Sequence, residues 1–425
     1  MKAYIRNLLV LLGLLALPGF GRAQFIFTTN NGVAITITGF NTSSLNLVIP
    51  AATNGYPVIG IGDFAFSSDH SVTNIVIPSS IVSIGRYAFY DCRRLASASI
   101  PAGVTNLGQI VFAYCTNLTN ITVDPANSTF SSAGGVLFNK AQTTLIESPC
   151  GLAGFYKVPG SVTNIGFAAF SSSAISGVNI PESVIDVNTH AFNDCLNLTN
   201  IDVDPANPAY SSVGGVLFNN KQTELYQFPS ALGGDYIVPA SVNYIGPEAF
   251  ELSGVTSVIL PKKIEFIGYL AFASCPGLKS IVIPGSVTNF GIDAFQSSTN
   301  FTSAYFLGNP PLDHLDSGDG QDAFQQTPAT VYYLPGAIGW TETYGDAPTV
   351  LWNPQASGLA FTGGQFAFNF TIPSNAVIVI EACTNLAQPV WLPVATNTFS
   401  GSGTSVFNDP QSANYPMRFY RMRSP

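Results

Sequence analysis

Residues 75–95 read IVIPSSIVSIGRYAFYDCRRL, and variants of this stretch recur along most of the chain. Each copy has a short apolar segment that ends in proline, a variant of SVTNIG, and a phenylalanine. Successive phenylalanines within a run are 22 or 23 residues apart. They are Phe66, Phe89, Phe112, Phe170, Phe192, Phe250, Phe272 and Phe295. A fixed period of this length predicts a repeat protein.

Each position of the period has a physical explanation. In I-x-I-P both isoleucines face one side of a strand, and proline ends the strand where its missing N–H does no harm. The Ile-Gly pair predicts a second extended piece followed by a corner. Phe, Cys and Leu spaced by three predict one face of a short 3₁₀ turn. One coil cannot bury its apolar face alone, so the sequence predicts a solenoid in which each coil covers the next.

A longer repeat lies over the short one. VDPAN at 123–127 returns at 203–207, and GGVLFN at 134–139 returns at 214–219. The offset is 80 residues in both cases, so the copies have kept the same length. A stack requires such constancy, because an insertion within it would break the register with both neighbours.

Four of the six cysteines occupy one position of the repeat, three residues after the phenylalanine. They are Cys92, Cys115, Cys195 and Cys275. Other copies carry Ser173, Ser253 or Ser298 there, and the first carries Asp69. A nucleophile or metal ligand could not alternate with serine from copy to copy. We therefore predict that these cysteines, with the repeated phenylalanines, form a structural core in which a small side chain fills space beside each ring.

The sequence leaves one exception open. Cys92 and Cys115 lie one coil apart, and adjacent rungs of a sheet have a Cα separation that a disulfide tolerates. A bridge between them depends on side-chain directions that the sequence does not reveal.

Taken together, the proline, Ile-Gly, Ala-Phe and Cys-x-x-Leu motifs resemble the BspA-type leucine-rich repeats over about residues 45–310. The resemblance implies a right-handed solenoid of short strands on an exported bacterial surface protein, used for adhesion or protein binding and without catalytic residues. The GGVLFN segments look like a common variant coil of that family.

The sequence predicts a mostly β protein with five segments. They are a signal peptide at 1–23, an N-terminal β cap at 24–50, a BspA-type leucine-rich-repeat solenoid at 51–312, a degenerate last repeat and linker at 313–350, and a C-terminal β domain at 351–425. The first segment has a positive start and a short apolar run, as export signals do. The last lacks the 22–23-residue period and has strands between turn residues, which predicts a small β-sandwich-like domain.

Composition and motifs limit the function. Charged residues make up 9% of the chain and the net charge is −9, so no basic surface for nucleic acid or anionic lipid is expected. No GxSxG, HExxH, Walker or GxGxxG pattern is present, so we expect neither an enzyme nor a cofactor. No stretch after the signal is long and apolar enough to span a membrane. The sequence favours a monomeric, exported, non-catalytic binding or adhesion protein, secreted or at the cell surface, that contacts a protein or cell-surface ligand through its repeats.

Two further hypotheses stay open. The loop DHLDSGDGQD contains closely spaced carboxylates that could bind calcium, although without the spacing of an EF-hand. These carboxylates belong to Asp313, Asp316, Asp319 and Asp322. The alternative function is carbohydrate binding by the C-terminal β domain, with the repeats as a spacer. Its candidate sugar-stacking residues are the tryptophans Trp340, Trp352 and Trp391, although aromatic residues are more often core.

Overall fold

The computed structural model describes residues 25–41, 45–313, 323–353, 355–372, 377–398 and 403–423. The predicted signal peptide at 1–23 lies outside these residues. The fold is nearly all β, which confirms the prediction of a mostly β solenoid with a small C-terminal β domain. Within the described ranges, no helix has the length and hydropathy needed to cross a membrane.

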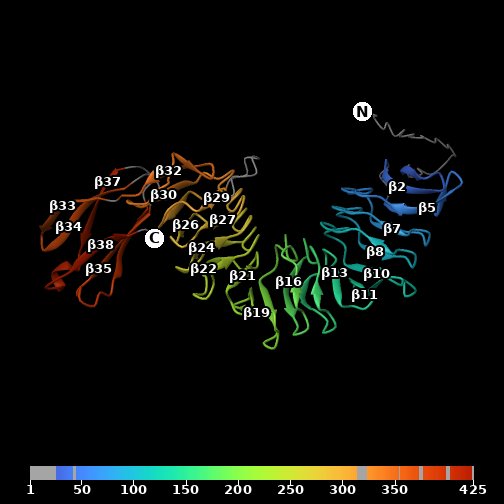
Figure 1. The fold of residues 1–425 in the computed structure, drawn as a ribbon, viewed down its shortest axis with the longest axis horizontal. Helices are drawn as coiled ribbons and strands as arrows, with labels where there is room; N and C mark the ends of the chain where they lie inside the picture. Colours follow the sequence, from blue (N-terminus) through green and yellow to red (C-terminus); the bar gives the residue numbers. More distant parts are fainter. Residues whose placement is uncertain are drawn as a thin grey trace. The chain divides into compact units, whose positions relative to one another are not determined.

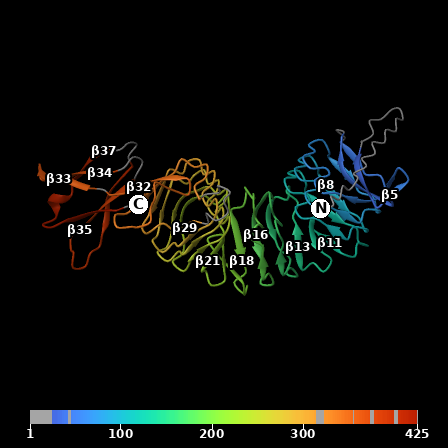
Figure 2. The same cartoon turned by 45° about the horizontal axis from the view of Figure 1, so that its top comes forward.

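The chain divides into two compact units. The first runs to Leu198 and includes Val203–Ala209, and the second comprises Thr199–Asp202 and the chain from Tyr210 onward. In both units the strands of successive coils lie side by side (Figures 1 and 2).

The strands of the first unit are short. They are β1 (Phe25–Asn30), β2 (Ala34–Phe40), β3 (Asn46–Val48), β4 (Ala52–Thr53), β5 (Tyr56–Ile61), β6 (Asn74–Val76), β7 (Ser83–Ile84), β8 (Ser97–Ile100), β9 (Asn106–Leu107), β10 (Asn120–Val123), β11 (Phe130–Ala133), β12 (Val136–Asn139), β13 (Thr144–Glu147), β14 (Gly154–Lys157), β15 (Asn164–Ile165), β16 (Ile175–Ile180) and β17 (Asp186–Val187). Strand β18 (Asn200–Val203) lies where the two units divide.

The second unit repeats this pattern and adds longer strands at its end. Its strands are β19 (Tyr210–Val213), β20 (Val216–Asn219), β21 (Glu224–Gln227), β22 (Gly234–Ile237), β23 (Tyr244–Ile245), β24 (Val255–Ile259), β25 (Phe266–Ile267), β26 (Ser280–Ile283), β27 (Asn289–Phe290), β28 (Ser303–Phe306), β29 (Leu312–Asp313), β30 (Thr330–Tyr333), β31 (Thr343–Tyr344), β32 (Ala347–Leu351), β33 (Gln355–Thr362), β34 (Gln365–Ile372), β35 (Val377–Cys383), β36 (Leu392–Thr398), β37 (Gly403–Asp409) and β38 (Phe419–Arg423). A 3₁₀ turn, η2, covers Ser412–Asn414.

Each regular coil contributes one strand to each of two parallel sheets. In the first unit the I-x-I-P strands form the order β10-β8-β6-β3, and the Ile-Gly strands extend the order β1-β2-β5-β7-β9. Alternation along β8 buries Ala98 and Ile100 and exposes Ser97 and Ser99, as a strand with one buried face requires.

The phenylalanines form the centre of the core. Each of the eight predicted rings is at most 2% exposed. Neighbouring rings stack nearly parallel, with centroids 5.2 Å apart for Phe66 and Phe89 and 4.8 Å apart for Phe250 and Phe272. The 22–23-residue period therefore places one ring above the next, close to the spacing of the strands.

The loop around each phenylalanine contains left-handed residues. In the coil of Phe89, Tyr87 and Asp91 have φ angles of 55° and 60°. The loop has the i→i+3 bonds of tight turns, such as Cys92 N–H to Phe89 O, but these residues interrupt any helical run. Left-handed backbone costs roughly 1–2 kcal/mol per non-glycine residue.

Hydrogen bonds between coils offset that cost. The N–H groups of Tyr87, Phe89 and Asp91 donate to carbonyls of the following coil, at 3.2, 3.0 and 2.8 Å. Right-handed and left-handed residues alternate in this loop, so every second N–H group points along the stack. The loop therefore continues the hydrogen bonding between coils although it is not a strand.

The duplicated segments form hairpins beside the stack. Strands β11 and β12 pair across Gly134 and Gly135, whose φ angles of 56° and 82° suit a tight hairpin turn. Strands β19 and β20 pair in the same register 80 residues later. The predicted variant coil is therefore a β-hairpin in both copies.

The C-terminal strands form two small antiparallel sheets, ordered β33-β34-β37 and β36-β35-β38. Their side chains share an apolar cluster that includes Phe370 and Ile380, and it continues onto Tyr305, Tyr332 and Trp352. The segment predicted to end in a linker includes β32, which pairs in parallel with β30 of the solenoid. The C-terminal sheets thus cover the end of the repeat stack.

Candidate interaction surface

A row of aromatic side chains lies on the outside of the first coils. Phe64 is 57% exposed, and its ring stacks on Tyr87 with centroids 4.9 Å apart. Tyr87 contacts Tyr90 edge to face at 5.6 Å, and Tyr90 contacts Tyr114 in the next coil at 5.1 Å. We call these four residues the aromatic strip.

The loop geometry explains how the strip forms. Phe64 and Tyr87 hold the left-handed position two residues before the core phenylalanine, and Tyr114 holds the one two residues after it. The N–H groups of Phe64 and Tyr87 donate to carbonyls of the following coil, and the ring of the core phenylalanine is buried inside the coil. Phe64 and Tyr87 share an offset and so stack in adjacent coils, whereas Tyr90 and Tyr114 meet from neighbouring offsets, one and two residues after their core phenylalanines.

Charged groups flank the strip. The guanidinium of Arg86 lies 5.8 Å from the centroid of the Tyr87 ring. Asp91 accepts a hydrogen bond from Arg93 Nε at 2.7 Å, and its other oxygen lies 3.0 Å from His70 Nε2. Together with Arg94, this region holds three of the chain's 15 lysines and arginines within nine residues. In a chain with few charges, that is a local concentration of arginine.

The protonation of the strip follows from these contacts. Burial opposes ionisation of Asp91, but hydrogen bonds from Arg93 and His70 outweigh it and lower the pKa of the carboxyl. Burial, followed by the 2.6 Å hydrogen bond that Tyr114 Oη donates to Asp194 Oδ2, raises the pKa of Tyr114. The surface therefore presents a neutral phenol at Tyr114 and a charged carboxylate at Asp91 at neutral pH.

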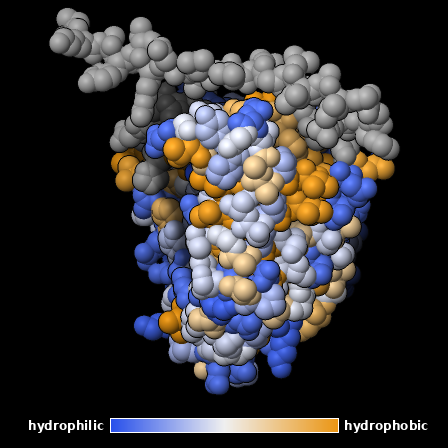
Figure 3. Space-filling model, turned by 90° about the vertical axis from the view of Figure 1, so that its right-hand side faces the viewer, coloured by the Kyte–Doolittle hydropathy of each residue, from blue (hydrophilic) through white to orange (hydrophobic). Residues whose placement is uncertain are grey.

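Hydrophobic residues reach the surface of the same unit. Val48, Val76 and Val82, on or beside the outer strand faces of these coils, are exposed. Figure 3 views the molecule from the end that carries the N-terminal strands and shows hydrophobic residues among hydrophilic ones on that face. Scattered exposed hydrophobic residues are normal on protein surfaces, so these valines do not by themselves mark a binding site.

The predicted core cysteines are buried and hydrogen-bonded. Each thiol donates to the carbonyl of the phenylalanine in the preceding coil: Cys92 to Phe66, Cys115 to Phe89, Cys195 to Phe170 and Cys275 to Phe250, at 2.9–3.1 Å. Ser298 Oγ makes the same bond to Phe272 O at 2.8 Å. Cysteine and serine share this position because both are small donors, so small size alone, which the sequence suggested, is not the whole reason.

The thiols have none of the properties of reactive cysteines. Burial raises the pKa of Cys275 to about 11 and that of Cys150 to about 12. A reactive cysteine is partly exposed and has a lowered pKa. Cys92 and Cys115 are both free, so the disulfide that the sequence left open is absent.

The remaining sequence hypotheses have these outcomes. Asp313 is the last residue of β29, while Asp316, Asp319 and Asp322 lie outside the described residues, so the calcium hypothesis stays untested. Elsewhere in the described chain, no group of three or more His, Cys, Asp or Glu side chains could hold a metal ion.

The tryptophans are engaged in contacts. Trp352 is buried, Trp340 stacks on Tyr333 at 5.2 Å, and Trp391 lies under Arg421 at 4.5 Å. None of these arrangements offers a bare ring face comparable to the exposed Phe64. The sugar-stacking hypothesis gains no support from them.

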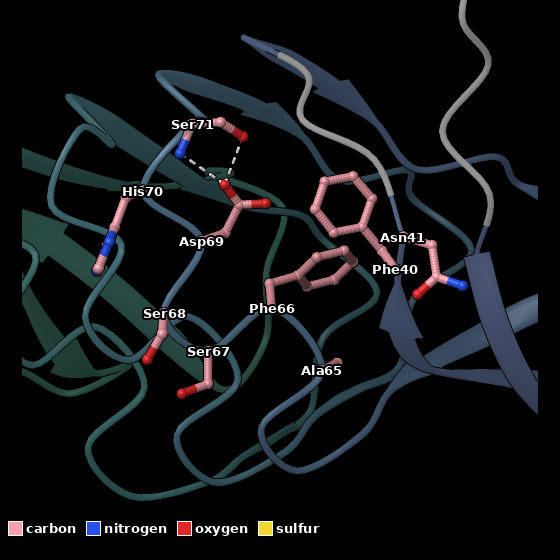
Figure 4. Close-up of a pocket in the computed structure, with 9 residues that line it drawn as sticks. All are labelled: Phe40, Asn41, Ala65, Phe66, Ser67, Ser68, Asp69, His70 and Ser71. Carbon is pink, nitrogen blue, oxygen red and sulfur yellow. Dashed lines mark hydrogen bonds between the residues drawn. The ribbon is translucent and has the colours of Figure 1, made fainter.

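A hollow of about 590 Å³ lies at the first coil (Figure 4). Phe40 and Phe66 line it and contact each other, with ring centroids 5.6 Å apart. Asp69 accepts hydrogen bonds from Ser71 N and Ser71 Oγ at 2.7 and 2.6 Å, so this carboxylate is already used within its loop.

The hollow lacks a catalytic arrangement. His70 is paired with Asp91, yet among the described residues no serine hydroxyl lies within hydrogen-bond distance of its ring. A nucleophile needs that contact with its base.

The sequence comparison decides the family. The model of the BspA type leucine-rich repeat region matches residues 40–155, 150–234 and 234–330, with six copies. The chain belongs to the BspA-type leucine-rich repeat family. Among curated proteins, none matches the chain significantly.

Solved structures of bacterial repeat proteins resemble the chain. A leucine-rich cell surface protein from Faecalibacterium prausnitzii has 23% identity over 76% of this chain and 95% of its own, with a TM-score of 0.42. A leucine-rich repeat protein from Eubacterium ventriosum has 20% identity over 75% and 78%, with a TM-score of 0.45. The pneumococcal vaccine antigen PcpA has 18% identity over 75% and 87%, with a TM-score of 0.42.

The BspA-type motifs explain the coils but not the strip. The motif positions are Pro, Ile, Phe and Cys, of which Ile, Phe and Cys are buried, whereas Tyr87, Tyr90 and Tyr114 occupy variable positions between them. A search for aromatic residues at matching offsets in adjacent copies could have found Phe64 and Tyr87, but not Tyr90 and Tyr114, whose offsets differ.

Proposed function

We propose that this protein is an exported, non-catalytic binding or adhesion protein, and that the aromatic strip with its arginines is the main contact surface for a protein or cell-surface ligand. The observation that carries the proposal is the coincidence of exposed Phe64 and three tyrosines with Arg86, Arg93 and Arg94 on adjacent coils. Tyrosine and arginine are the residue types enriched where protein interfaces hold most of their binding energy.

The low charge of the chain fits the same proposal. With 9% charged residues, long-range steering is weak, and affinity depends on contact between surfaces. A repeat surface can bury a standard interface without a deep pocket. Membership of the BspA-type family supports a role at the bacterial surface, and the signal-like residues 1–23 support export.

The test compares matched surface variants of the whole protein. The double variant Tyr87→Ser and Tyr90→Ser removes two strip residues, while Tyr269→Ser removes an exposed tyrosine of the second unit outside the strip. Fluorescently labelled proteins are titrated on intact bacterial and animal cells and on arrays of extracellular matrix proteins.

We expect the double variant to lose at least about tenfold in affinity, about 1.4 kcal/mol, on the surface that binds the native protein. The Tyr269→Ser control should bind as the native protein does. Equal binding by all three proteins would reject the strip as the contact surface. Turnover of a polymer by the purified protein would reject the non-catalytic part of the proposal.

A further inference from the structure

The solenoid sheet of the second unit is interrupted at one place. Strands β22 and β24 form one parallel pair, and β26, β28, β30 and β32 belong to another sheet. Strands β24 and β26 come from successive coils, yet no ladder joins them. Elsewhere in this unit β26 and β28, one coil apart, pair in register over four residues. The interruption therefore leaves two strand edges facing each other.

A cavity of about 420 Å³ lies at this interruption. Its walls are mainly apolar and come from three successive coils, and Arg423 at the end of β38 also lines it. The lining includes Val258, Leu260, Ile281, Val282, Leu307 and Arg423. Its volume is in the range of pockets that hold small organic molecules.

The cavity reaches the hydrophobic core. Val258 and Leu260 are 5% and 8% exposed, whereas Val178 and Ile180, which hold the same positions in the first copy of the duplicated block, are 0% exposed. The interrupted ladder thus opens inward-facing side chains that are sealed in the copy 80 residues earlier.

Two cationic groups lie at this cavity. Lys262 follows the I-L-P end of its coil and has no hydrogen bond or ion pair with the residues that the structure describes. Arg423 is held by a 2.7 Å bond from its Nε to Glu381 Oε1, which fixes its position on β38. Lys262 is exposed, so its ammonium group lies in solvent at the mouth of the cavity, where a ligand could reach it.

We propose that this cavity binds a small amphipathic carboxylate, with its hydrocarbon part between β24 and β26 and its carboxylate at Lys262 and Arg423. Apolar walls that span three coils suit an extended alkyl chain. The ammonium group of Lys262 and the guanidinium group of Arg423 attract a carboxylate through charge-assisted hydrogen bonds. The site is separate from the aromatic strip, which belongs to the first unit.

Isothermal titration calorimetry of the whole protein with decanoate tests the proposal, with decanol as the uncharged probe of the same chain length. The native protein should bind one decanoate saturably and bind decanol at least about tenfold more weakly, since a charge contact of about 1.4 kcal/mol is then missing.

Matched variants identify the site. Lys262→Glu should weaken decanoate binding at least tenfold, whereas Lys263→Glu, one residue along and outside the cavity lining, should leave it unchanged. Ile259→Gln alters an exposed wall residue and should weaken both probes. Absence of saturable binding, equal binding of decanol, or equal losses from both lysine variants would each overturn the proposal.

Discussion

The position three residues after each core phenylalanine is chosen for a hydrogen-bond donor. Where a preceding coil offers a phenylalanine carbonyl, Cys92 or Ser298 donates to it. Asp69 belongs to the first phenylalanine of the series, so it has no such carbonyl behind it and instead accepts bonds within its own loop. Ser173 follows the first hairpin insertion, and its buried hydroxyl has no partner among the described groups. Ser253 differs again, because its hydroxyl lies 3.5 Å from the thiol of Cys275 in the following coil, so a small polar side chain is common to these positions but its partner varies.

Glu147 also replaces a missing hydrogen-bond partner of a core phenylalanine, but its side chain accepts the hydrogen bond instead of donating it. In a regular coil the phenylalanine N–H donates to the carbonyl of the next coil, but after Phe112 the hairpin insertion replaces that loop. Glu147 Oε1 accepts from Phe112 N–H at 2.8 Å instead. The residue 80 positions later is Gln227, whose amide oxygen could serve as the same kind of acceptor without a charge.

Glu147 predicts a pH-dependent stability. Burial raises its pKa from 4.5 to about 7, although backbone N–H groups of Phe112 and Val111 oppose the shift. The folded protein then holds the proton of Glu147 more tightly than the unfolded chain does. The stabilisation of the fold by protonated Glu147 is therefore complete below about pH 4.5 and is lost as the pH rises through about 7. We expect Glu147→Gln to be more stable than the native protein at pH 8, by at most about 3 kcal/mol, and equal to it at pH 4.5.

Urea unfolding at several pH values measures this difference. The control is Glu182→Gln, which changes a glutamate outside the core. If the difference between native protein and Glu147→Gln does not vary with pH, Glu147 is not a buried titrating group.

At the scale of elements, a buried asparagine helps to attach each hairpin insertion to the stack. Asn127 is fully buried, its Nδ2 donates to Pro101 O and Val104 O at 2.8 and 2.9 Å, and its Oδ1 accepts from Thr129 N and Phe130 N at 2.8 Å. Asn207 makes corresponding bonds to Pro181 O and Val184 O in the second copy. An amide is the side chain that can donate twice and accept twice in this way.

Removing this attachment should loosen the first hairpin. Asn127→Ala leaves two carbonyls and two N–H groups without their partner, so we expect a loss on the order of 2 kcal/mol in unfolding free energy. Hydrogen exchange should become faster at Thr129, Phe130 and along β11 and β12. Asn300→Ala is the control, since the exposed Asn300 makes a single bond, to Pro276 O. Unchanged hydrogen exchange in the hairpin would show that the pairing of β11 with β12 is enough to keep the hairpin folded.

At the scale of the whole molecule, a stack of coils needs both ends covered. Strands β1 and β2 begin the first unit, with Phe25 and Phe40 against Phe66. In the second unit the C-terminal sheets cover Tyr305 and Tyr332 of β28 and β30, through a cluster that includes Phe370 and Ile378. The predicted C-terminal domain therefore also acts as a cap, because its sheets cover the last coils of the solenoid.

Deleting residues 354–425 should expose that end. We expect the shortened protein to melt at a lower temperature and to bind a hydrophobic dye, because Tyr305 and Tyr332 lose their cover. Adding Tyr305→Ser and Tyr332→Ser to the shortened protein should reduce the dye binding. A shortened protein with the native melting temperature and no dye binding would mean that the C-terminal sheets fold and function apart from the solenoid.

The fold could be predicted well because its determinants are local and repeated. Each coil brings the chain back to the same position in the stack, one strand spacing further along. The fixed length between Phe66 and Phe89 and the alternation of apolar residues before Pro78 therefore indicate the architecture from the sequence alone. The family follows from the same residues.

The surfaces could not be predicted in this way. Tyr87 and Tyr90 are visible in the opening stretch, but only the stacking of left-handed loops places Phe64 and Tyr114 beside them. The interruption between β24 and β26 likewise occurs in coils whose motifs look ordinary. Repetition along the chain determined which side chains are buried, while contacts between coils decided which exposed ones meet, because neighbours across the stack are more than 20 residues apart in sequence.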